Sequence, residues 1–397
     1  MLEKGYPEDI RTVPAVIAGD PQNRHGIILA KSPAAKRLGI GTGASLFEAL
    51  QLCPDLQIFS PDYDLYLSCS EAMYGILLEY SPAIQRFSID ECFMDFDRCE
   101  KRFGSPVETA FAIKERIKAQ LGFTVNVGVG ANKLLAKMAG ELQKPDMVHT
   151  LLSRQDIENK LWPLPVEELF MVGRASSKKL KKLNINTIGE LACSDPLLLR
   201  SVLKSHGHLI WEYANGIDRD RVVPNDQIVQ KGLSNSMTLP HDVTDREEAE
   251  RYILALTDRV TGRLRRHGCK ASLLGISVKT SSFVRYSHQM QLPFFLDDTT
   301  RIYDYLCRLF RECWRAEPIR QLGVHLTEFT RADQYQLTFY DLQRIGEEEA
   351  LNRVVDQIRE RFGQTAIYRG TFVNTPLKPL EGGVNDGNYM MMGGYKQ

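Results

Sequence analysis

Two adjacent carboxylates, Asp90 and Glu91, stand between two short apolar segments in the sequence SIDECFMD that begins at Ser88. The flanking segments, residues 84–89 and 91–96, are predicted strands. Neighbouring residues on a regular strand point to opposite faces of a sheet. Both carboxylates can therefore serve one site only if a turn or bulge interrupts the strand, and we predict such a break. A polar hairpin turn without chemistry is the alternative interpretation.

Paired carboxylates are typical of sites for Mg²⁺, a hard cation that prefers oxygen ligands. In a two-metal site the ions lie about 3.5–4 Å apart, where one activates the attacking hydroxyl and the other stabilises the leaving pyrophosphate. On this interpretation Asp90 and Glu91 are the candidate catalytic residues and metal ligands.

The residues around the pair alternate between strand and helix patterns. A helix is predicted over residues 62–79, and Ser105-Pro106 opens another with capping-box spacing and proline at the first helical position. A strand over residues 123–129 follows, and Asn132 can cap a helix that ends near Leu142. This order predicts an α+β sandwich with helices on one face of an antiparallel sheet.

The rest of the chain has a different pattern on each side of this block. Strands are predicted at 13–18 and 27–30 and a helix at 45–52, while residues 151–222 are almost wholly helical and residues 223–231 are a polar linker. Residues 232–330 have the order βαββαβ, which resembles a ferredoxin-like unit. The predicted strands lie near 233–238, 272–280, 286–292 and 319–329, and the helices at 246–266 and 299–314. One more helix is expected near 347–362.

Composition limits where a partner can bind. The chain has 397 residues, enough for two to four domains, and its 50 basic and 50 acidic residues cancel. Any basic surface must therefore be local. No apolar run is long enough to span a membrane. The eight cysteines form no C-x-x-C pair, so we expect reduced thiols in a cytoplasmic protein and no zinc site.

A second motif combines a strand, a glycine turn and a basic helix, in the sequence VNVGVGANKLLAKMA from Val125. It is not a Walker A loop. Lys133 and Lys137, taken alone, are typical of a solvated helix face. Lys144, in a Lys-Pro pair beyond the helix end, can reach a triphosphate.

Together the two motifs resemble the Y-family DNA polymerases, the UmuC/DinB class. In that family S-I-D-E is followed by G-[IV]-[SG]-x-N-K-x-[LF]-A-K and a terminal K-P, and the resemblance extends in domain order over residues 9–340. It implies a multidomain α+β right-hand polymerase with palm, small fingers, helical thumb and ferredoxin-like little finger. It also implies that Asp90 and Glu91 bind Mg²⁺ and that Lys144 binds the triphosphate.

The function implied by the resemblance is translesion DNA synthesis, the template-directed transfer of nucleotides from dNTPs past damaged bases in SOS-type DNA repair. The partners implied are primer–template DNA and dNTPs. The implied domains are fingers at 1–62, palm at 63–150, thumb at 151–222, linker at 223–231, little finger at 232–330 and a C-terminal tail at 331–397.

The fingers segment, residues 26–40, departs from the pattern of many family members. Pro33 and Lys36 stand where Tyr and Arg usually contact phosphate. Lys36 keeps the positive charge without the bidentate geometry of Arg, whereas Pro33 cannot donate a hydrogen bond. An exposed helix charge is the alternative for Lys36. The Ser-Pro-Ala sequence from Ser32 is similar to the UmuC-like branch more than to the DinB branch.

Two basic regions are candidate DNA contacts. In the thumb, residues 170–191 resemble a degenerate helix-hairpin-helix, in which Gly173, Lys178 and Lys181 are candidates; a purely structural hairpin is the alternative. In the little finger the candidates are Arg265 and Arg266.

The segment Gln336-Leu337-Thr338-Phe339-Tyr340 resembles the Q-L-x-L-F peptide with which bacterial polymerases dock on the sliding clamp. Such a peptide places Leu337, Phe339 and Tyr340 in a pocket of its partner. An ordinary edge segment is the alternative.

Two other classes of protein compete with a polymerase. One is a binding protein that holds primer–template DNA and clamp without chemistry, and loss of function on replacing Asp90 or Glu91 with Ala separates it from a polymerase. A nucleotide cyclase on a similar palm does not explain the thumb, the little-finger pattern or the clamp-like peptide.

In the family the first metal-binding Asp lies on an opening palm strand, in a D-x-x-x-F-Y-A-S-V-E context that has no counterpart here. We expect that one strand is missing, and prefer a wrongly chosen start codon over a truly truncated, inactive protein.

We therefore predict that the chain beginning at Met1 extends primers poorly, because its site lacks one carboxylate for Mg²⁺. A chain extended upstream should be robustly active. Primer extension with both forms side by side checks this, and equal robust activity would contradict it.

Overall fold

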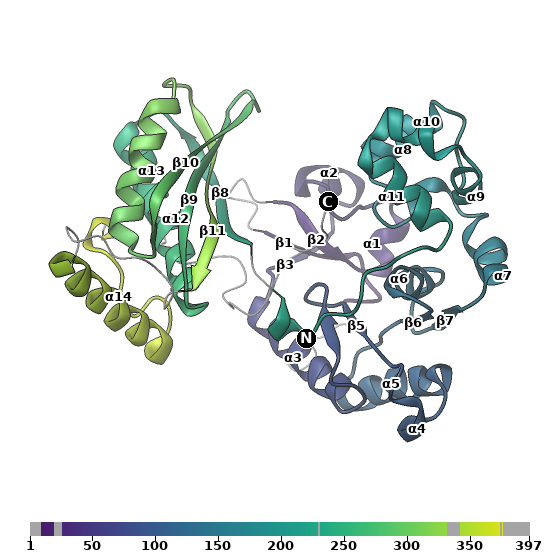
Figure 1. The fold of residues 1–397 in the computed structure, drawn as a ribbon. Coiled ribbons are helices and arrows are strands. Elements are labelled where there is room, and N and C mark those ends of the chain that lie inside the picture. Colours follow the sequence, from purple (N-terminus) through teal and green to yellow (C-terminus); the bar gives the residue numbers. More distant parts are fainter. Residues whose placement is uncertain (1–8, 20–25, 229–230, 332–341, 374, 376–397) are drawn as a thin grey trace. The chain divides into compact units, whose positions relative to one another are not determined.

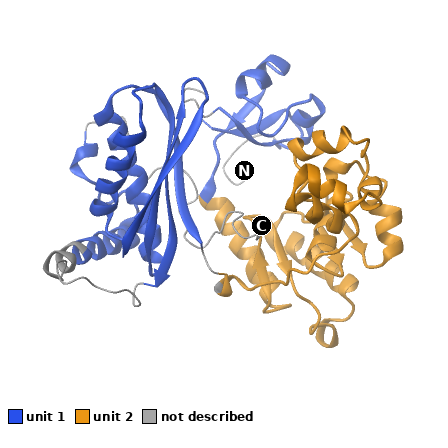
Figure 2. Ribbon diagram, turned by 45° about the horizontal axis from the view of Figure 1, so that its top comes forward, with its two compact units in different colours: residues 1–63, 230–387 blue, residues 64–229, 388–397 orange. Residues whose placement is uncertain are grey.

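The computed structural model describes residues 9–19, 26–228, 231–331, 342–373 and 375 of the chain (Figure 1). The chain divides into two compact units, residues 1–63 with 230–387 and residues 64–229 with 388–397 (Figure 2). All eight cysteines are free thiols. No helix in the described ranges is both long and apolar enough to cross a membrane.

The first part of unit 1 is a small sheet with two short helices. Its strands have the order β2-β1-β3, with β2 antiparallel and β3 parallel to β1. Both helices begin at a serine whose hydroxyl accepts a backbone N–H, Ser32 for α1 and Ser45 for α2, as expected for N-caps. The elements are β1 (Ala15–Ala18), β2 (Ile28–Lys31), α1 (Pro33–Arg37), α2 (Leu46–Leu52) and β3 (Gln57–Phe59).

The second part of unit 1 confirms the predicted order βαββαβ. A four-stranded antiparallel sheet has the strand order β10-β9-β11-β8, and two helices cover one of its faces (Figure 1). The sequence pattern gives the order of elements but leaves open which strands are neighbours. The elements are β8 (Gly232–Val243), α12 (Arg246–Arg266), β9 (Cys269–Thr280), β10 (Arg285–Leu296), α13 (Thr299–Cys313) and β11 (Ile319–Arg331).

A final helix, α14 (Leu342–Phe362), docks on this domain through ion pairs. Arg359 binds Asp258 of α12 at 2.7 Å, with both side chains at most 5% exposed. Phe372, in a short 3-10 turn after α14, is buried in the same core. Charged residues this deeply buried are stable only when paired, so α14 is an integral part of the domain.

The palm segment of unit 2 consists of two small sheets and three main helices. Its elements are α3 (Tyr63–Leu78), β4 (Ile84–Arg86), β5 (Cys92–Met94), α4 (Glu100–Phe103), α5 (Pro106–Leu121), β6 (Val127–Gly130), α6 (Lys133–Glu141) and β7 (Val148–Leu151). The predicted caps are confirmed, since Ser105 and Glu108 form a capping box for α5 and Asn132 caps α6.

The predicted single antiparallel sheet in this segment is wrong. In the described residues β4 pairs antiparallel with β5, whereas β6 pairs parallel with β7 in a separate sheet. The sequence pattern missed β7, which follows α6. A strand-helix-strand crossover makes neighbouring strands parallel, so β6, α6 and β7 form a βαβ unit.

The second segment of unit 2 is helical, as predicted for residues 151–222. Its elements are α7 (Arg154–Asp156) continued by a π-helical turn over Ile157–Leu161, α8 (Arg174–Lys181), α9 (Ile188–Ala192), α10 (Pro196–Leu203) and α11 (Ser205–Ala214). They pack around one apolar core that also includes Leu134, Leu135 and Met138 of α6. The palm helix α6 and the thumb helices therefore share a core.

Candidate active site

The predicted break at the carboxylate pair is confirmed. Strand β4 ends at Arg86, β5 begins at Cys92, and residues 87–91 form a turn between them. The turn is closed because the backbone N–H groups of Phe87 and Ser88 both donate to the carbonyl oxygen of Glu91, at 2.8 and 3.1 Å. The Ser88 hydroxyl also donates to the carboxylate of Asp90, at 2.5 Å. The turn thus presents two consecutive acidic side chains, of which Asp90 is exposed.

Lys137 of α6 binds the second carboxylate. Its Nζ lies 2.9 Å from Oε1 and 3.0 Å from Oε2 of Glu91, so it contacts both oxygens. The Lys137 side chain is only 15% exposed, against 38% for Glu91. This residue was not among the sites predicted from sequence, although it is the last lysine of the family pattern N-K-x-[LF]-A-K.

The interpretation of Lys133 and Lys137 as a solvated helix face is wrong. Lys133 is buried and donates to Oε1 of Gln85 at 3.2 Å and to the carbonyl of Arg221 at 3.3 Å. Aromatic rings cover both ammonium groups, since Nζ of Lys133 lies 5.5 Å from the Phe93 ring centre and Nζ of Lys137 lies 5.1 Å from that of Phe87. The helix face that carries both lysines is turned toward the carboxylate hairpin.

Two glycines allow α6 to lie directly on β6. A Cβ at Gly128 would overlap the carbonyl oxygen of Ala136 and the backbone nitrogen of Gly140. A Cβ at Gly130 would lie 2.5 Å from the carbonyl carbon of Leu135. The G-x-G sequence is therefore explained by close helix–strand packing, and this packing determines where Lys137 lies.

The end of the predicted thumb and the start of the polar linker are hydrogen-bonded to the palm. The side chain of Asn132 donates to the carbonyl of Gly216 at 2.9 Å, and Asp218 accepts from the backbone N–H of Leu134 at 3.1 Å. Further along, Asn225 accepts from the backbone N–H of Arg86 at 2.9 Å, at the edge of the carboxylate hairpin. These bonds hold residues 216–225 along the palm, a contact that the sequence did not predict.

The two predicted nucleotide-binding lysines are both exposed. Lys144, three residues beyond α6, forms an ion pair with Glu141 at 2.7 Å in which both side chains are about half exposed. Lys36 lies near the end of α1 in unit 1, after Pro33 at the first helical position. An exposed pair contributes only about 0–1 kcal/mol, so Lys144 can exchange Glu141 for another anion at little cost.

The predicted DNA contacts in the thumb lie at both ends of α8, with Gly173 at its start and Lys178 and Lys181 in its last turn. Gly173 is the N-cap residue of this helix, and Lys178 is exposed on it. Lys181 forms an exposed ion pair with Glu167 at 2.7 Å. The N-terminal N–H groups of a helix favour phosphate, which fits the position of Gly173.

The structure separates the two little-finger arginines. Arg266 is exposed at the end of α12. Arg265 is 11% exposed and makes a bidentate ion pair with Asp356 of α14, at 2.6 and 3.0 Å. The guanidinium also donates to the carbonyl oxygen of Asp297 and to the hydroxyl of Thr299. Because these partners use its donors, the prediction that Arg265 contacts DNA is wrong. The clamp-like peptide, Gln336 to Tyr340, lies outside the described residues.

The donor set at the turn fits a hard divalent cation, because Asp90 and Glu91 offer only oxygen ligands. A carboxylate has about four lone-pair positions, and Lys137 uses two of those on Glu91. Within the described residues no cluster of three or more His, Cys, Asp or Glu side chains is arranged to hold a metal ion.

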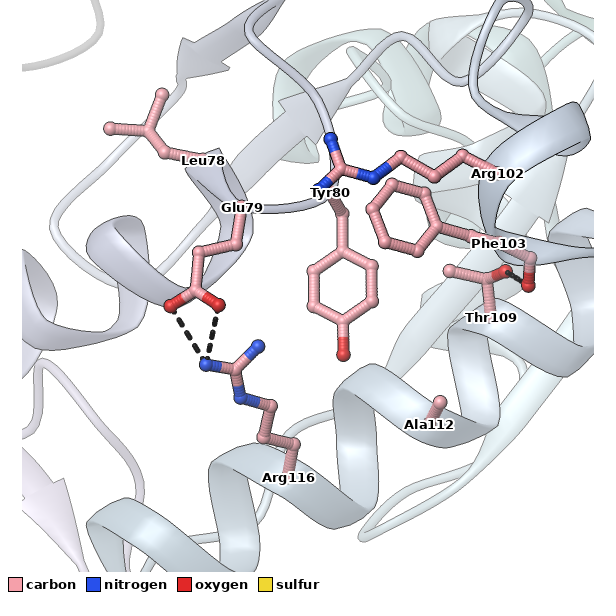
Figure 3. A pocket seen from close by; sticks show the side chains of 8 residues that line it. All are labelled: Leu78, Glu79, Tyr80, Arg102, Phe103, Thr109, Ala112 and Arg116. Carbon is pink, nitrogen blue, oxygen red and sulfur yellow. Dashed lines mark hydrogen bonds and ion pairs between the residues drawn. The ribbon is translucent and has the colours of Figure 1, made fainter.

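A pocket of about 580 Å³ opens elsewhere in unit 2, between the end of α3, α4 and α5 (Figure 3). Arg116 reaches across it from α5 to bind Glu79 at 2.7 Å, beside the ring of Tyr80. None of the residues predicted to bind metal or nucleotide lines this pocket.

Comparisons with known proteins agree over most of the chain. The impB/mucB/samB family matches residues 2–141, the C-terminal domain of the same family matches residues 230–339, and the IMS family HHH motif matches residues 154–185. The DNA polymerase IV of Clostridium acetobutylicum is 44% identical over 95% of this chain and 94% of its own length. The DNA polymerase IV 2 of Bacillus subtilis is 33% identical over 96% of this chain and 93% of its own.

Solved structures show the same fold. A Y-family DNA polymerase chimera of Dbh and Dpo4 matches with a TM-score of 0.72 at 19% identity, over 82% of this chain and 95% of the other. DinB from Sulfolobus solfataricus matches with a TM-score of 0.56 at 20% identity, over 82% and 94%. These structures confirm the α+β right-hand architecture with palm, fingers, thumb and little finger.

The chain belongs to the impB/mucB/samB family, the Y family of DNA polymerases. Within it the relatives named DNA polymerase IV indicate the DinB type. The likeness of Ser32-Pro33-Ala34 to the UmuC-like branch was therefore misleading, since three residues carry little information on a subfamily. The protein is a DNA-directed DNA polymerase of translesion synthesis, acting on primer–template DNA and nucleotides, in a family that depends on divalent metal ions.

We predict that Gly128→Ala lowers the free energy of unfolding by about 2–3 kcal/mol, because the new methyl group overlaps the backbone of α6. Gly140→Ala is the matched control, since its Cβ would lie no closer than 3.6 Å to Gly128 and alanine favours the helix by up to about 1 kcal/mol. Urea unfolding of both variants measures the difference. Equal stability of the two would contradict the close packing of α6 on β6.

Proposed function

We propose that Asp90 and Glu91 bind Mg²⁺ and that the turn they occupy is the catalytic centre for nucleotidyl transfer. The observation that carries the proposal is a closed turn that presents two consecutive carboxylates, one of them held by Lys137 on a helix packed against the palm. The chemistry that such an ion supplies is activation of the attacking hydroxyl and stabilisation of the leaving pyrophosphate.

The chain's own residues bind and orient the substrates around that turn. Lys144 binds the triphosphate of the incoming nucleotide, releasing its exposed partner Glu141. Lys36 of the fingers contributes a second cation as a point charge. Residues 1–62 act as fingers, 63–150 as palm, 151–222 as thumb, 223–231 as linker and 232–330 as little finger, with a tail over 331–397.

Primer–template DNA contacts the thumb through Gly173, Lys178 and Lys181. In the little finger the DNA contacts Arg266 and the sheet face opposite α12 and α13. Strand register aligns Arg285, Lys279, Gln321 and Thr238 in one row of that face, and Ser287, Ser277, Gly323 and Ser236 in the next. These two rows hold two cations and no carboxylate, a composition suited to a phosphate backbone.

That sheet face is flattened by glycine. A Cβ at Gly275 would overlap the ring of His325, and one at Gly323 would lie 2.5 Å from Oγ of Ser277. Small side chains let a duplex approach the backbone of the strands closely. We further propose that the peptide Gln336, Leu337, Phe339 and Tyr340 docks on the bacterial sliding clamp, and that the protein acts in the cytoplasm.

A non-catalytic DNA- and clamp-binding protein is the second candidate, but the polymerase relatives along the whole chain do not favour it. Asp90→Ala and Glu91→Ala should each lower the rate of primer extension at least about 100-fold, because several kcal/mol of transition-state stabilisation is lost. DNA affinity should stay within about twofold. Asp97→Ala, an exposed carboxylate just beyond β5, is the control. Single-turnover kinetics measure the rates, and unchanged rates in both variants would overturn the catalytic role of Asp90 and Glu91.

Neutralising a true phosphate contact lowers the salt dependence of DNA binding. Lys178→Ala and Arg266→Ala should each reduce the slope of log affinity against log salt by about 1. Lys118→Ala should leave the slope unchanged, since Lys118, which belongs to α5 of the palm, is paired with Asp146. Fluorescence anisotropy at several salt concentrations measures the slopes, and three equal slopes would exclude both residues as phosphate contacts.

A further inference from the structure

We propose that Lys137 is a positioning residue for Glu91, which holds the carboxylate in the orientation that binds the divalent metal. The inference rests on the proposed role of Glu91 as a metal ligand. It assigns a function to the last lysine of the family pattern N-K-x-[LF]-A-K, which was not among the predicted site residues.

The first observation is the geometry of the ion pair. Nζ of Lys137 lies at nearly equal distances, 2.9 and 3.0 Å, from the two oxygens of Glu91. A symmetrical contact of this kind fixes the direction in which the carboxylate faces. It leaves about two of the four lone-pair positions for another ligand. Lys137 can therefore remain bound while Glu91 coordinates a metal ion.

The second observation is that Lys137 itself has little freedom. Its Nζ lies 5.1 Å from the ring centre of Phe87 and 5.5 Å from that of Phe170. Phe170 is fixed in turn by stacking on Tyr213, at 6.3 Å and 17°, and these two rings belong to the thumb segment. An ammonium group between aromatic faces is stabilised there by the ring electrons, and it needs an anion on its open side.

The third observation is that the backbone carrying Lys137 is fixed. Gly128 and Gly130 bring α6 against β6, and Asn132 anchors the start of the helix to Gly216. Lys144 lacks all of these constraints, because it lies beyond the helix and its pair with Glu141 is exposed. Lys137 therefore holds a carboxylate in a fixed position, whereas Lys144 can exchange Glu141 for another anion.

The positive charge of Lys137 and its orienting contact with Glu91 predict opposite changes in metal affinity when this lysine is replaced. The ammonium charge repels a metal ion, so an effect of charge alone predicts tighter metal binding when the lysine is removed. Loss of a group that orients a metal ligand typically weakens binding 10–100-fold. We therefore expect metal binding to become weaker when Lys137 is replaced.

The test measures Mn²⁺ binding to the full chain by electron paramagnetic resonance, a readout that does not require turnover. Lys137→Met should weaken Mn²⁺ binding about 10-fold. Lys137→Gln, which keeps a hydrogen-bond donor without the charge, should lie between the unsubstituted chain and Lys137→Met. Circular dichroism confirms that each variant is folded, and Lys137→Gln provides the test if Lys137→Met does not fold.

Two further variants separate the failure of this proposal from failure of the metal site. Lys133→Met removes a buried lysine one turn earlier on α6, which donates to Gln85 and Arg221, and should leave Mn²⁺ affinity within about twofold. If Glu91→Gln weakens binding but Lys137→Met leaves it unchanged or tighter, Lys137 has no positioning role and the metal site stands. If Glu91→Gln has no effect, both the metal site and the role of Lys137 are overturned.

Discussion

The carboxylate site depends on how closely α6 lies against β6. Gly128 and Gly130 lack the Cβ atoms that would overlap the helix backbone, so the two elements are in direct contact. That contact sets the position of Lys137, which in turn binds both oxygens of Glu91. The G-x-G motif thus has a packing role here, and it fixes the position of Glu91 through Lys137 of α6.

The same helix joins the palm to the thumb. Leu134, Leu135 and Met138 enter the thumb core, while Asn132 and Leu134 bind Gly216 and Asp218 at the end of the thumb segment. Residues that face the carboxylate hairpin and residues that face the thumb alternate on one nine-residue element. A change in the packing of α6 should therefore affect the carboxylate hairpin and the thumb core together.

Sequence patterns predicted the elements whose signals are local. Capping residues such as Ser105 and Asn132, and the break at Asp90 and Glu91, follow from properties of a few neighbouring residues. Contacts between distant residues were not predictable in this way. No local signal indicates that Lys137 forms an ion pair with Glu91, 46 residues earlier, or that Arg265 forms one with Asp356. The parallel pairing of β7 with β6 is likewise a contact between distant residues. The family resemblance supplied the architecture, but not these side-chain partners.

In the proposed site Asp90 and Glu91 bind the metal ion while Lys137 keeps Glu91 in place. A crystal structure of the protein with primer–template DNA, a nucleotide and Mn²⁺ shows whether they do, because anomalous scattering locates the ion. We expect a Mn²⁺ peak roughly 2 Å from oxygens of Asp90 and Glu91, with Nζ of Lys137 still in hydrogen-bond contact with Glu91. A Mn²⁺ peak away from these carboxylates, or Lys137 turned away from Glu91, would contradict it.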